Sequence, residues 1–227
     1  MTGLDRLWPL FGVRLLTKRL ELRAMCEADL AEIAALVPGD AEPDPRLPRF
    51  AFVDPAVVRA TMSFQSYWSS MGNWSVEDWR VGFVARLRAG GHLGPTGSLI
   101  GTSELEAEGW VVRRTVGTGS WLVEAARRQD YGKEMRAAML TLAFGGLEAA
   151  VAETEALSEN SASLGVSRSL GYQPNGEVIH DHNGTPARMM RFRLPREVWD
   201  EHIRAAWPTQ IEGLEAAKVL FGLHAEI

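Results

Sequence analysis

The spacing of apolar and polar positions predicts one strand and two helices in the first part of the chain. Residues 20–23 alternate apolar and polar side chains, as a strand with one buried face does. Apolar residues recur at helical spacing over 30–35, and Asp29 precedes them as a candidate helix cap. A proline-containing loop is expected over 41–55, followed by a longer helix over 55–71.

Three further strands are expected over 79–87, 98–106 and 111–123, and together they predict an antiparallel meander. A glycine-containing turn over 90–97 separates the first two of them. The third mixes β-branched, aromatic and glycine residues, as does a strand that contains a bulge or lets another backbone come close. A ligand could therefore lie along this third strand.

An amphipathic helix is expected to begin near Gly132. Its apolar residues fall at i, i+3, i+4, i+7 and i+8, which places them on one face: Met135, Ala138, Met139, Leu142 and Ala143. Gly145-Gly146 supplies the stop signal. A further strand is expected over 153–157, parallel to the strand over 111–123 because the helix connects them.

The last part of the chain predicts a hairpin, a helix and a tail. Asn183-Gly184 is a strong turn signal between strands expected over 176–181 and 187–194. A helix over 195–206 follows.

The chain of 227 residues, 46% of them hydrophobic, predicts one domain over 1–205 with a C-terminal extension over 206–227. The extension includes Trp207, Leu214 and Phe221 and is too apolar to remain in water. We expect it to pack on its own domain or on a second subunit.

Charge and cysteine content narrow the range of partners. The net charge of −5, without a long basic run, disfavours nucleic acid. The single Cys26 excludes an internal disulfide and a cysteine-based metal site, and it suits a reducing compartment.

No apolar stretch has the length of a signal peptide or a membrane span, so we expect a cytoplasmic protein with no membrane partner. His180 and His182 alternate on a strand, but no third ligand is identifiable, so no metal site is predicted.

A charged, turn-forming loop runs directly into the helix that begins near Gly132. The N-terminus of a helix presents backbone amides without intrahelical partners, and the helix dipole adds partial positive charge there, so a pyrophosphate is favoured at this point. Two adjacent arginines strengthen the prediction. The candidate contacts are consecutive: Arg127, Arg128, Gln129, Asp130, Tyr131, Gly132, Lys133 and Glu134.

A second polar stretch predicts a short helix further along the chain. Asn160 or Ser161 is placed to cap it, and Gly171 to end it in a left-handed conformation. Asn160, Ser163 and Ser167 then share one face. This stripe could hydrogen-bond a cofactor, or it could be a solvated helix face.

These two stretches resemble the motifs of the GNAT acyltransferases, most of all those of the RimJ/RimL-type branch. The loop over 127–132 is similar to the family's acetyl-CoA-binding pattern, with Gln or Arg first, Gly fourth and Gly or Ala sixth. The stretch over 160–172 is similar to its N-x-x-S and L-G-F/Y signature. The resemblance implies an α/β (α+β) fold with a mixed, mostly antiparallel central sheet flanked by helices.

The resemblance also implies an activity and a set of contacts. The expected activity is transfer of an acetyl group from acetyl-CoA to a primary amine of a small molecule or peptide, by direct attack and without a metal. The pyrophosphate would lie on the loop over 127–134, and the pantetheine arm along Trp121, Leu122 and Val123, with Asn160 and Ser163 beside it. The helix over 55–71 would form one wall of the acceptor site.

One position departs from the family pattern, because Asp130 stands where the first glycine is usual. A carboxylate beside a pyrophosphate is electrostatically unfavourable, and a Cβ there narrows the approach to the backbone. Alternatively, Asp130 is the helix N-cap, with its side chain turned onto the amides of the first turn. We favour the cap.

The expected chemistry needs a base for the acceptor ammonium and an acid for the leaving thiolate. Ser167 stands where many GNAT enzymes carry a tyrosine acid, so the resemblance implies that its hydroxyl, or a water it holds, protonates the thiolate. The alternative is that Ser167 bonds to its own helix. Glu104 and Glu106 are candidate bases, or else solvated carboxylates on a strand.

Two further questions remain open at the level of sequence. The motif contacts recognise the CoA carrier, so a larger acyl group such as succinyl would also fit. Asp130 and the missing tyrosine keep a second hypothesis, a catalytically silent acyl-CoA-binding or sensing protein. We also expect a homodimer, on the basis of the apolar C-terminal extension.

Overall fold

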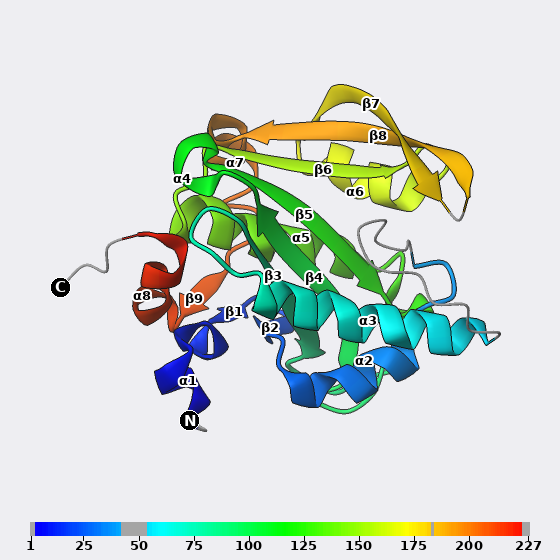
Figure 1. Cartoon of the computed structure of the whole chain (residues 1–227), viewed down its shortest axis with the longest axis horizontal. Coiled ribbons are helices and arrows are strands. Elements are labelled where there is room, and N and C mark those ends of the chain that lie inside the picture. Colours follow the sequence, from blue (N-terminus) through cyan, green and yellow to red (C-terminus); the bar gives the residue numbers. More distant parts are fainter. Residues whose placement is uncertain (1–2, 42–53, 183, 224–227) are drawn as a thin grey trace.

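The computed structural model describes residues 3–41, 54–182 and 184–223, which surround one mixed sheet. The strands are β1 (Arg14–Leu16), β2 (Leu20–Ala24), β3 (Trp79–Leu87), β4 (Leu99–Ala107), β5 (Thr115–Leu122), β6 (Val151–Leu157), β7 (Gln173–His182), β8 (Thr185–Pro195) and β9 (Gln210–Glu212). The helices are α1 (Leu4–Leu7), α2 (Leu30–Leu36), α3 (Pro55–Gly72), α4 (Trp110–Arg113), α5 (Tyr131–Leu140), α6 (Ser161–Ser169), α7 (Arg196–His202) and α8 (Leu214–Ala217). Figure 1 shows α2 and α3 on one face of the sheet and α5 on the other.

The strands follow the order β7-β8-β6-β5-β4-β3-β2-β1-β9. Neighbours are antiparallel except for β5 and β6, which are parallel and joined through α5. The predicted fold, a mixed and mostly antiparallel sheet flanked by helices, is therefore confirmed. The loop expected over 41–55 lies largely outside the described residues, as does Asn183 of the expected turn.

The two parallel strands separate part-way along their length. Backbone pairing joins Thr115 to Val151, Val116 to Ala152 and Gly117 to Glu153, and it ends there. Beyond this point residues 118–122 of β5 and 154–157 of β6 diverge, as Figure 1 shows, and we call this opening the fork. The fork leaves the facing backbone edges of two strands without ladder partners.

Helix α5 covers the sheet on the side opposite α3, and it is buried on every side over residues 134–140, not only on the predicted apolar face. Met135, Ala138 and Met139 are fully buried in the main core. The helix continues as a π-helical turn over Thr141–Gly146, so the predicted stop at Gly145-Gly146 is confirmed.

The strand predicted over 111–123 is wrong at its start. Trp110–Arg113 form the short helix α4, and β5 begins only at Thr115. Gly109 and Arg114 flank α4 in the left-handed region, with φ of 58° and 45°. The indole of Trp110 is fully buried and donates to the carbonyl of Phe221 at 2.9 Å. This tertiary contact overrides the β propensity of the adjacent valines.

Other boundaries move by a few residues, as expected of pattern-based assignments. Strand β3 matches the predicted range 79–87, and β6 begins at Val151 instead of 153. Helix α7 ends at His202 instead of 206.

The predicted cap of α2 is also wrong, because the Asp29 side chain accepts no hydrogen bond from the first turn of α2 and instead accepts from the Cys26 amide of the preceding turn at 3.0 Å. Its carboxylate, 3% exposed, accepts from Arg23 at 2.5 and 2.8 Å and from Arg86 at 3.1 Å. Burial alone would raise the pKa of Asp29, but the hydrogen bonds from Arg23 and from the Cys26 amide outweigh it, and the pKa lies below its usual value. Asp29 therefore fixes α2 to the sheet as a buried, paired charge.

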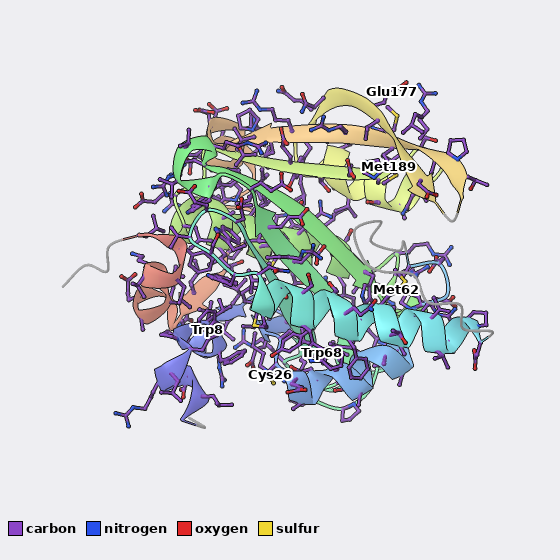
Figure 2. The ribbon with its side chains drawn as sticks, viewed as in Figure 1. Trp8, Cys26, Met62, Trp68, Glu177 and Met189 are labelled. Carbon is purple, nitrogen blue, oxygen red and sulfur yellow. The ribbon has the colours of Figure 1, made fainter. Side chains whose placement is uncertain are left out.

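The two ends of the described chain pack together through strands that the sequence pattern did not predict. β9 pairs with β1, and Leu214 and Phe221 are buried in the main core. Trp8, labelled in Figure 2, packs edge-on against Trp74 with ring centroids 5.7 Å apart, and Trp74 contacts Phe221 at 5.4 Å. The described part of the C-terminal extension thus packs on its own chain. Among the described helices, none has both the length and the apolarity needed to cross a bilayer.

Candidate active site

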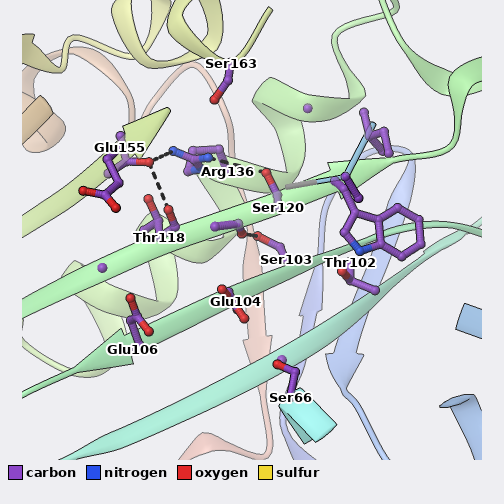
Figure 3. Close-up of a pocket in the computed structure, with 18 of the residues that line it drawn as sticks. Ser66, Thr102, Ser103, Glu104, Glu106, Thr118, Ser120, Arg136, Glu155 and Ser163 are labelled. Carbon is purple, nitrogen blue, oxygen red and sulfur yellow. Dashed lines mark hydrogen bonds between the residues drawn. The ribbon is translucent and has the colours of Figure 1, made fainter. Parts of the chain in front are cut away.

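A cavity of about 1180 Å³ follows the fork. Its walls come from α3, β4, β5 and β6, from the first turn of α5, and from α6. Figure 3 shows this arrangement, with Ser163 of α6 on one side of the fork and Glu104 and Glu106 of β4 on the other. The cavity therefore joins the two motif regions that lie apart in the sequence.

The first turn of α5 presents open backbone amides to this cavity. The first bond inside the helix runs from the amide of Glu134 to the carbonyl of Asp130 at 3.0 Å, so the amides of Tyr131, Gly132 and Lys133 precede it. Gly132 and Lys133 line the cavity. Amides in this position, with the helix dipole behind them, suit a phosphate group.

The prediction that the Asp130 side chain caps α5 is wrong. Asp130 occupies the N-cap position, but its φ of 62° is left-handed and its side chain makes no capping hydrogen bond. A capping residue needs an extended conformation to turn its oxygen onto the first-turn amides. Instead the exposed carboxylate pairs with Lys133 Nζ at 2.8 Å, and the hydrogen bond from Lys133 lowers the pKa of Asp130. The backbone here has the conformation that glycine adopts most readily.

This conformation makes a testable prediction. Asp130→Gly should melt at or above the temperature of the wild type, whereas Asp130→Ala should melt lower, because alanine tolerates the left-handed region poorly. Both variants should bind acetyl-CoA about two- to fivefold more tightly, since each removes an exposed carboxylate beside the helix N-terminus. Thermal melts and calorimetry measure the two effects. Equal destabilisation of both variants would show that the side chain, not the backbone, matters.

The arginines of the loop differ in what they can bind. The guanidinium of Arg127 makes two hydrogen bonds of 2.7 Å to the carboxylate of Asp40, and its Nε donates to the carbonyl of Leu122 at 3.2 Å. The hydrogen bonds from Arg127 hold the pKa of Asp40 below its usual value. Arg127 thus fastens the loop, and it lines the cavity together with the exposed Arg128 and the half-buried Lys133.

Three residues of the predicted phosphate loop lie beneath it and do not line the cavity: Gln129, Tyr131 and Glu134. Glu134 is 3% exposed and accepts from Thr17 Oγ1 at 2.6 Å, and from the Arg19 amide and Nε at 2.9 and 2.6 Å. Arg19 also donates to the carbonyl of Gln129 at 3.0 Å and lies over the ring of Tyr131, 4.0 Å from its centroid. These residues support the loop from below.

Strand β5 contributes Trp121 and Leu122 to the cavity wall. Val123, grouped with them from the sequence, packs against the main core and donates its amide to Ile100 at 2.9 Å. Two of the three predicted pantetheine contacts therefore lie at the fork.

Two glycines of β5 make room for two glutamates of β4. Gly119 pairs with Glu104 and Gly117 with Glu106. A Cβ at Gly119 would lie 2.9 Å from Glu104 Oε1, and one at Gly117 would lie 2.9 Å from Glu106 Cγ. Both half-buried glutamates thus lie across the neighbouring strand and line the cavity, and Glu106 pairs with Arg80 at 3.5 Å.

Helix α6 follows the sequence prediction at both ends. The side chain of Asn160 accepts from the amide of Ser163 at 3.1 Å, and Gly171 has the expected left-handed φ of 79°. Asn160 and Ser163 line the cavity, but Ser167 does not. Ser167 is 1% exposed and donates its hydroxyl to the carbonyl of Ser163 at 3.1 Å, the bond to its own helix named above as the alternative.

Tyr172 ends the second motif region and packs in the main core, with its hydroxyl 3.3 Å from Thr118 Oγ1. Sequence reasoning missed one residue at the base of the fork. Arg136 of α5 is 3% exposed and reaches between β5 and β6, as Figure 3 shows. The available signal was a single arginine between Met135 and Ala137 on an otherwise apolar stretch of helix.

Among the described residues, no three histidine, cysteine, aspartate or glutamate side chains gather in a way that could hold a metal ion.

Solved structures with a similar fold include acetyltransferases. The chain superposes on Mycobacterium smegmatis RimJ in complex with CoA-disulfide with a TM-score of 0.64 and 18% identity, over 82% of this chain and 86% of that one. It superposes on the spermidine/spermine N-acetyltransferase SpeG from Vibrio cholerae with a TM-score of 0.59 and 16% identity, over 81% and 96% of the two chains. At these identities the likeness shows the fold.

The sequence itself supplies the family. The family model for the acetyltransferase (GNAT) domain matches residues 19–173, which is more than half of the chain and includes both motif regions. The chain therefore belongs to the GNAT acetyltransferase family.

Proposed function

We propose that this protein transfers an acyl group from acyl-CoA to a primary amine of a small molecule or peptide, in the manner of the RimJ/RimL-type branch. The observation that carries the proposal is the cavity along the fork, which connects the open amides of α5 to the carboxylate of Glu104. The open amides suit the diphosphate of the donor, and the carboxylate at the other end of the same cavity suits the ammonium of the acceptor.

The residues present suit the CoA carrier. The diphosphate would accept hydrogen bonds from the amides of Gly132 and Lys133, with Arg128 and Lys133 supplying charge. The pantetheine arm would lie in the fork along Leu122, where the β5 edge has no ladder partner, with Asn160 on the opposite wall. The arm would then point its thioester toward the closed end of the fork.

The chemistry is a direct transfer of the acyl group. The acceptor ammonium loses a proton to Glu104, the neutral amine forms a C–N bond with the thioester carbon, and the C–S bond breaks to release the thiolate. The nitrogen loses its second proton as the amide forms, and this proton passes through water to the thiolate, because the Ser167 hydroxyl is already bonded to its own helix. Helix α3, which lines the cavity with Ser66 and Tyr67, forms the wall on the acceptor side.

The decisive experiment is a thiol-release assay with acetyl-CoA and succinyl-CoA against polyamines, N-terminal peptides and aminoglycosides. Turnover with any amine, together with acylated product by mass spectrometry, supports the proposal. Tight acyl-CoA binding without turnover across the panel would instead favour a silent acyl-CoA-binding protein.

A substitution at Gly132 tests the location of the diphosphate. A Cβ at this position would lie 3.6 Å from its nearest neighbours in Leu122 and Val166, so valine fits the protein but crowds the ligand. We expect Gly132→Val to weaken acetyl-CoA binding on the order of tenfold, about the loss of one hydrogen bond to a charged group. Gly72→Val, in a helix where an added Cβ has no neighbour within 4 Å, is the matched control. Unchanged affinity in calorimetry would place the diphosphate elsewhere.

A further inference from the structure

Arg136 is a buried cation for which the described residues supply no counter-charge. Its side chain is 3% exposed and lines the cavity of the fork. Its Nη1 donates to Thr154 Oγ1 at 3.1 Å, and its Nη2 donates weakly to Ser120 Oγ at 3.4 Å. The buried Nε has no acceptor, and no carboxylate of the described chain pairs with this guanidinium.

Burying an unpaired guanidinium costs free energy unless a ligand supplies its missing hydrogen bonds and charge. Guanidinium carries five N–H donors and a charge that stays at every accessible pH. Buried charges in proteins are normally paired and fully hydrogen-bonded, since transfer of an unpaired charge from water is strongly unfavourable. Neutral hydroxyls such as those of Thr154 and Ser120 do not supply the missing charge. The unfilled donors of Arg136 therefore point to an anionic oxygen that arrives with the ligand.

The position of Arg136 identifies which part of the ligand this is. The open edge of β5 runs from residue 118 to residue 122, about 13 Å at roughly 3.3 Å per residue. The diphosphate site at α5 lies near the Leu122 end, whereas Arg136 bonds to Ser120 and Thr154, toward the closed end. An arm that enters at Leu122 would bring its acyl group, not its phosphates, to Arg136.

The cationic Arg136 and the carboxylate of Glu104 lie on opposite faces of the sheet. Side chains alternate between faces along a strand, so Ser120 lies on the face opposite to the one that Gly119 leaves for Glu104. Arg136 contacts Ser120 from the α5 side. An anionic acyl group can thus meet Arg136 without meeting Glu104, which is left to the cationic acceptor.

We propose that Arg136 binds a carboxylate at the end of the acyl group, and that the preferred donor is a dicarboxylic acyl-CoA such as succinyl-CoA. This inference rests on the proposed function and specifies its donor. The carboxylate would complete the hydrogen bonding of the guanidinium in a planar, two-point contact. The acyl transfer itself remains as described above, and Arg136 selects the donor without taking part in proton transfer.

Calorimetry with succinyl-CoA, butyryl-CoA and acetyl-CoA tests the inference without an acceptor. Succinyl and butyryl chains have the same length and differ in the terminal charge. We expect the wild type to bind succinyl-CoA at least tenfold more tightly than butyryl-CoA. Arg136→Met should remove this preference while keeping the affinity for butyryl-CoA, and Arg136→Lys should retain part of it.

Arg168→Met is the matched control, because Arg168 lies on α6, does not line the cavity and should leave the preference unchanged. A wild type that binds all three without preference overturns the inference and leaves the proposed function standing. An equal loss of affinity for all three in Arg136→Met also overturns it, because Arg136 would then only tie β5 to β6. A wild type that binds none of them removes the proposed function together with the inference.

Discussion

Replacing Glu134 with alanine is expected to lower the free energy of unfolding by about 3 to 4 kcal/mol, as the removal of one partner from a buried ion pair does. The Glu134 side chain is buried and accepts three hydrogen bonds from Thr17 and Arg19, more than a hundred residues earlier in the chain. In the alanine variant Thr17 Oγ1 and the Arg19 amide lose their acceptor in the protein interior. Urea denaturation followed by circular dichroism measures the change.

Glu134→Gln is the matched control for this prediction. Glutamine keeps an oxygen that can accept from Thr17 Oγ1, but it loses the charge that pairs with Arg19 at 2.6 Å. The free energy of unfolding of the glutamine variant should therefore lie between that of the wild type and that of the alanine variant. Because Arg19 also holds the carbonyl of Gln129 and covers Tyr131, acetyl-CoA affinity should fall with stability. If the free energy of unfolding of the alanine variant lies within about 1 kcal/mol of the wild-type value, the contacts of Glu134 with Thr17 and Arg19 do not support the loop.

Replacing Glu104 with glutamine is expected to reduce turnover on the order of a hundredfold, the usual contribution of a positioned general base. Glu104 lies across Gly119 at the fork and lines the cavity, whereas the amide of glutamine cannot accept a proton from the acceptor ammonium. The affinity for acetyl-CoA should remain unchanged, because the proposed diphosphate site lies at the other end of the cavity. Steady-state kinetics with the amine identified by the panel, together with calorimetry, separate these two quantities.

Ser167→Ala is the comparison variant for the catalytic prediction. The Ser167 hydroxyl is buried and bonded to the carbonyl of Ser163, so its removal should change turnover by less than about threefold. A large loss in Ser167→Ala would restore the hypothesis that this serine protonates the thiolate. Full turnover in Glu104→Gln would show that another group, or water alone, takes the proton from the amine.

Local features of the sequence predicted much of the architecture correctly. Periodicity predicted helix α5, although burial on every side over 134–140 was not expected, and the strand over 79–87 matches β3. The cap at Asn160 and the left-handed Gly171 followed from side-chain chemistry within a few residues. These features depend on neighbours along the chain, so a single sequence contains the information needed to read them.

The tertiary structure decided the features that depend on distant partners. Arg127 lines the cavity with the predicted loop, but its guanidinium also pairs with Asp40, 87 positions away. Asp130 occupies the cap position, but its left-handed backbone turns its carboxylate to Lys133.

The strand, loop and helix beside the cavity, the polar cap of α6 and the family could be read from the sequence, because periodicity, capping and motif spacing are local properties. The fork, the glutamates that lie across Gly117 and Gly119, and the burial of Arg136 became visible only in the folded chain. Strand separation and cross-strand packing depend on register between segments far apart in the chain. The charge environment of the site arises from that register, and the pattern of one sequence does not specify it.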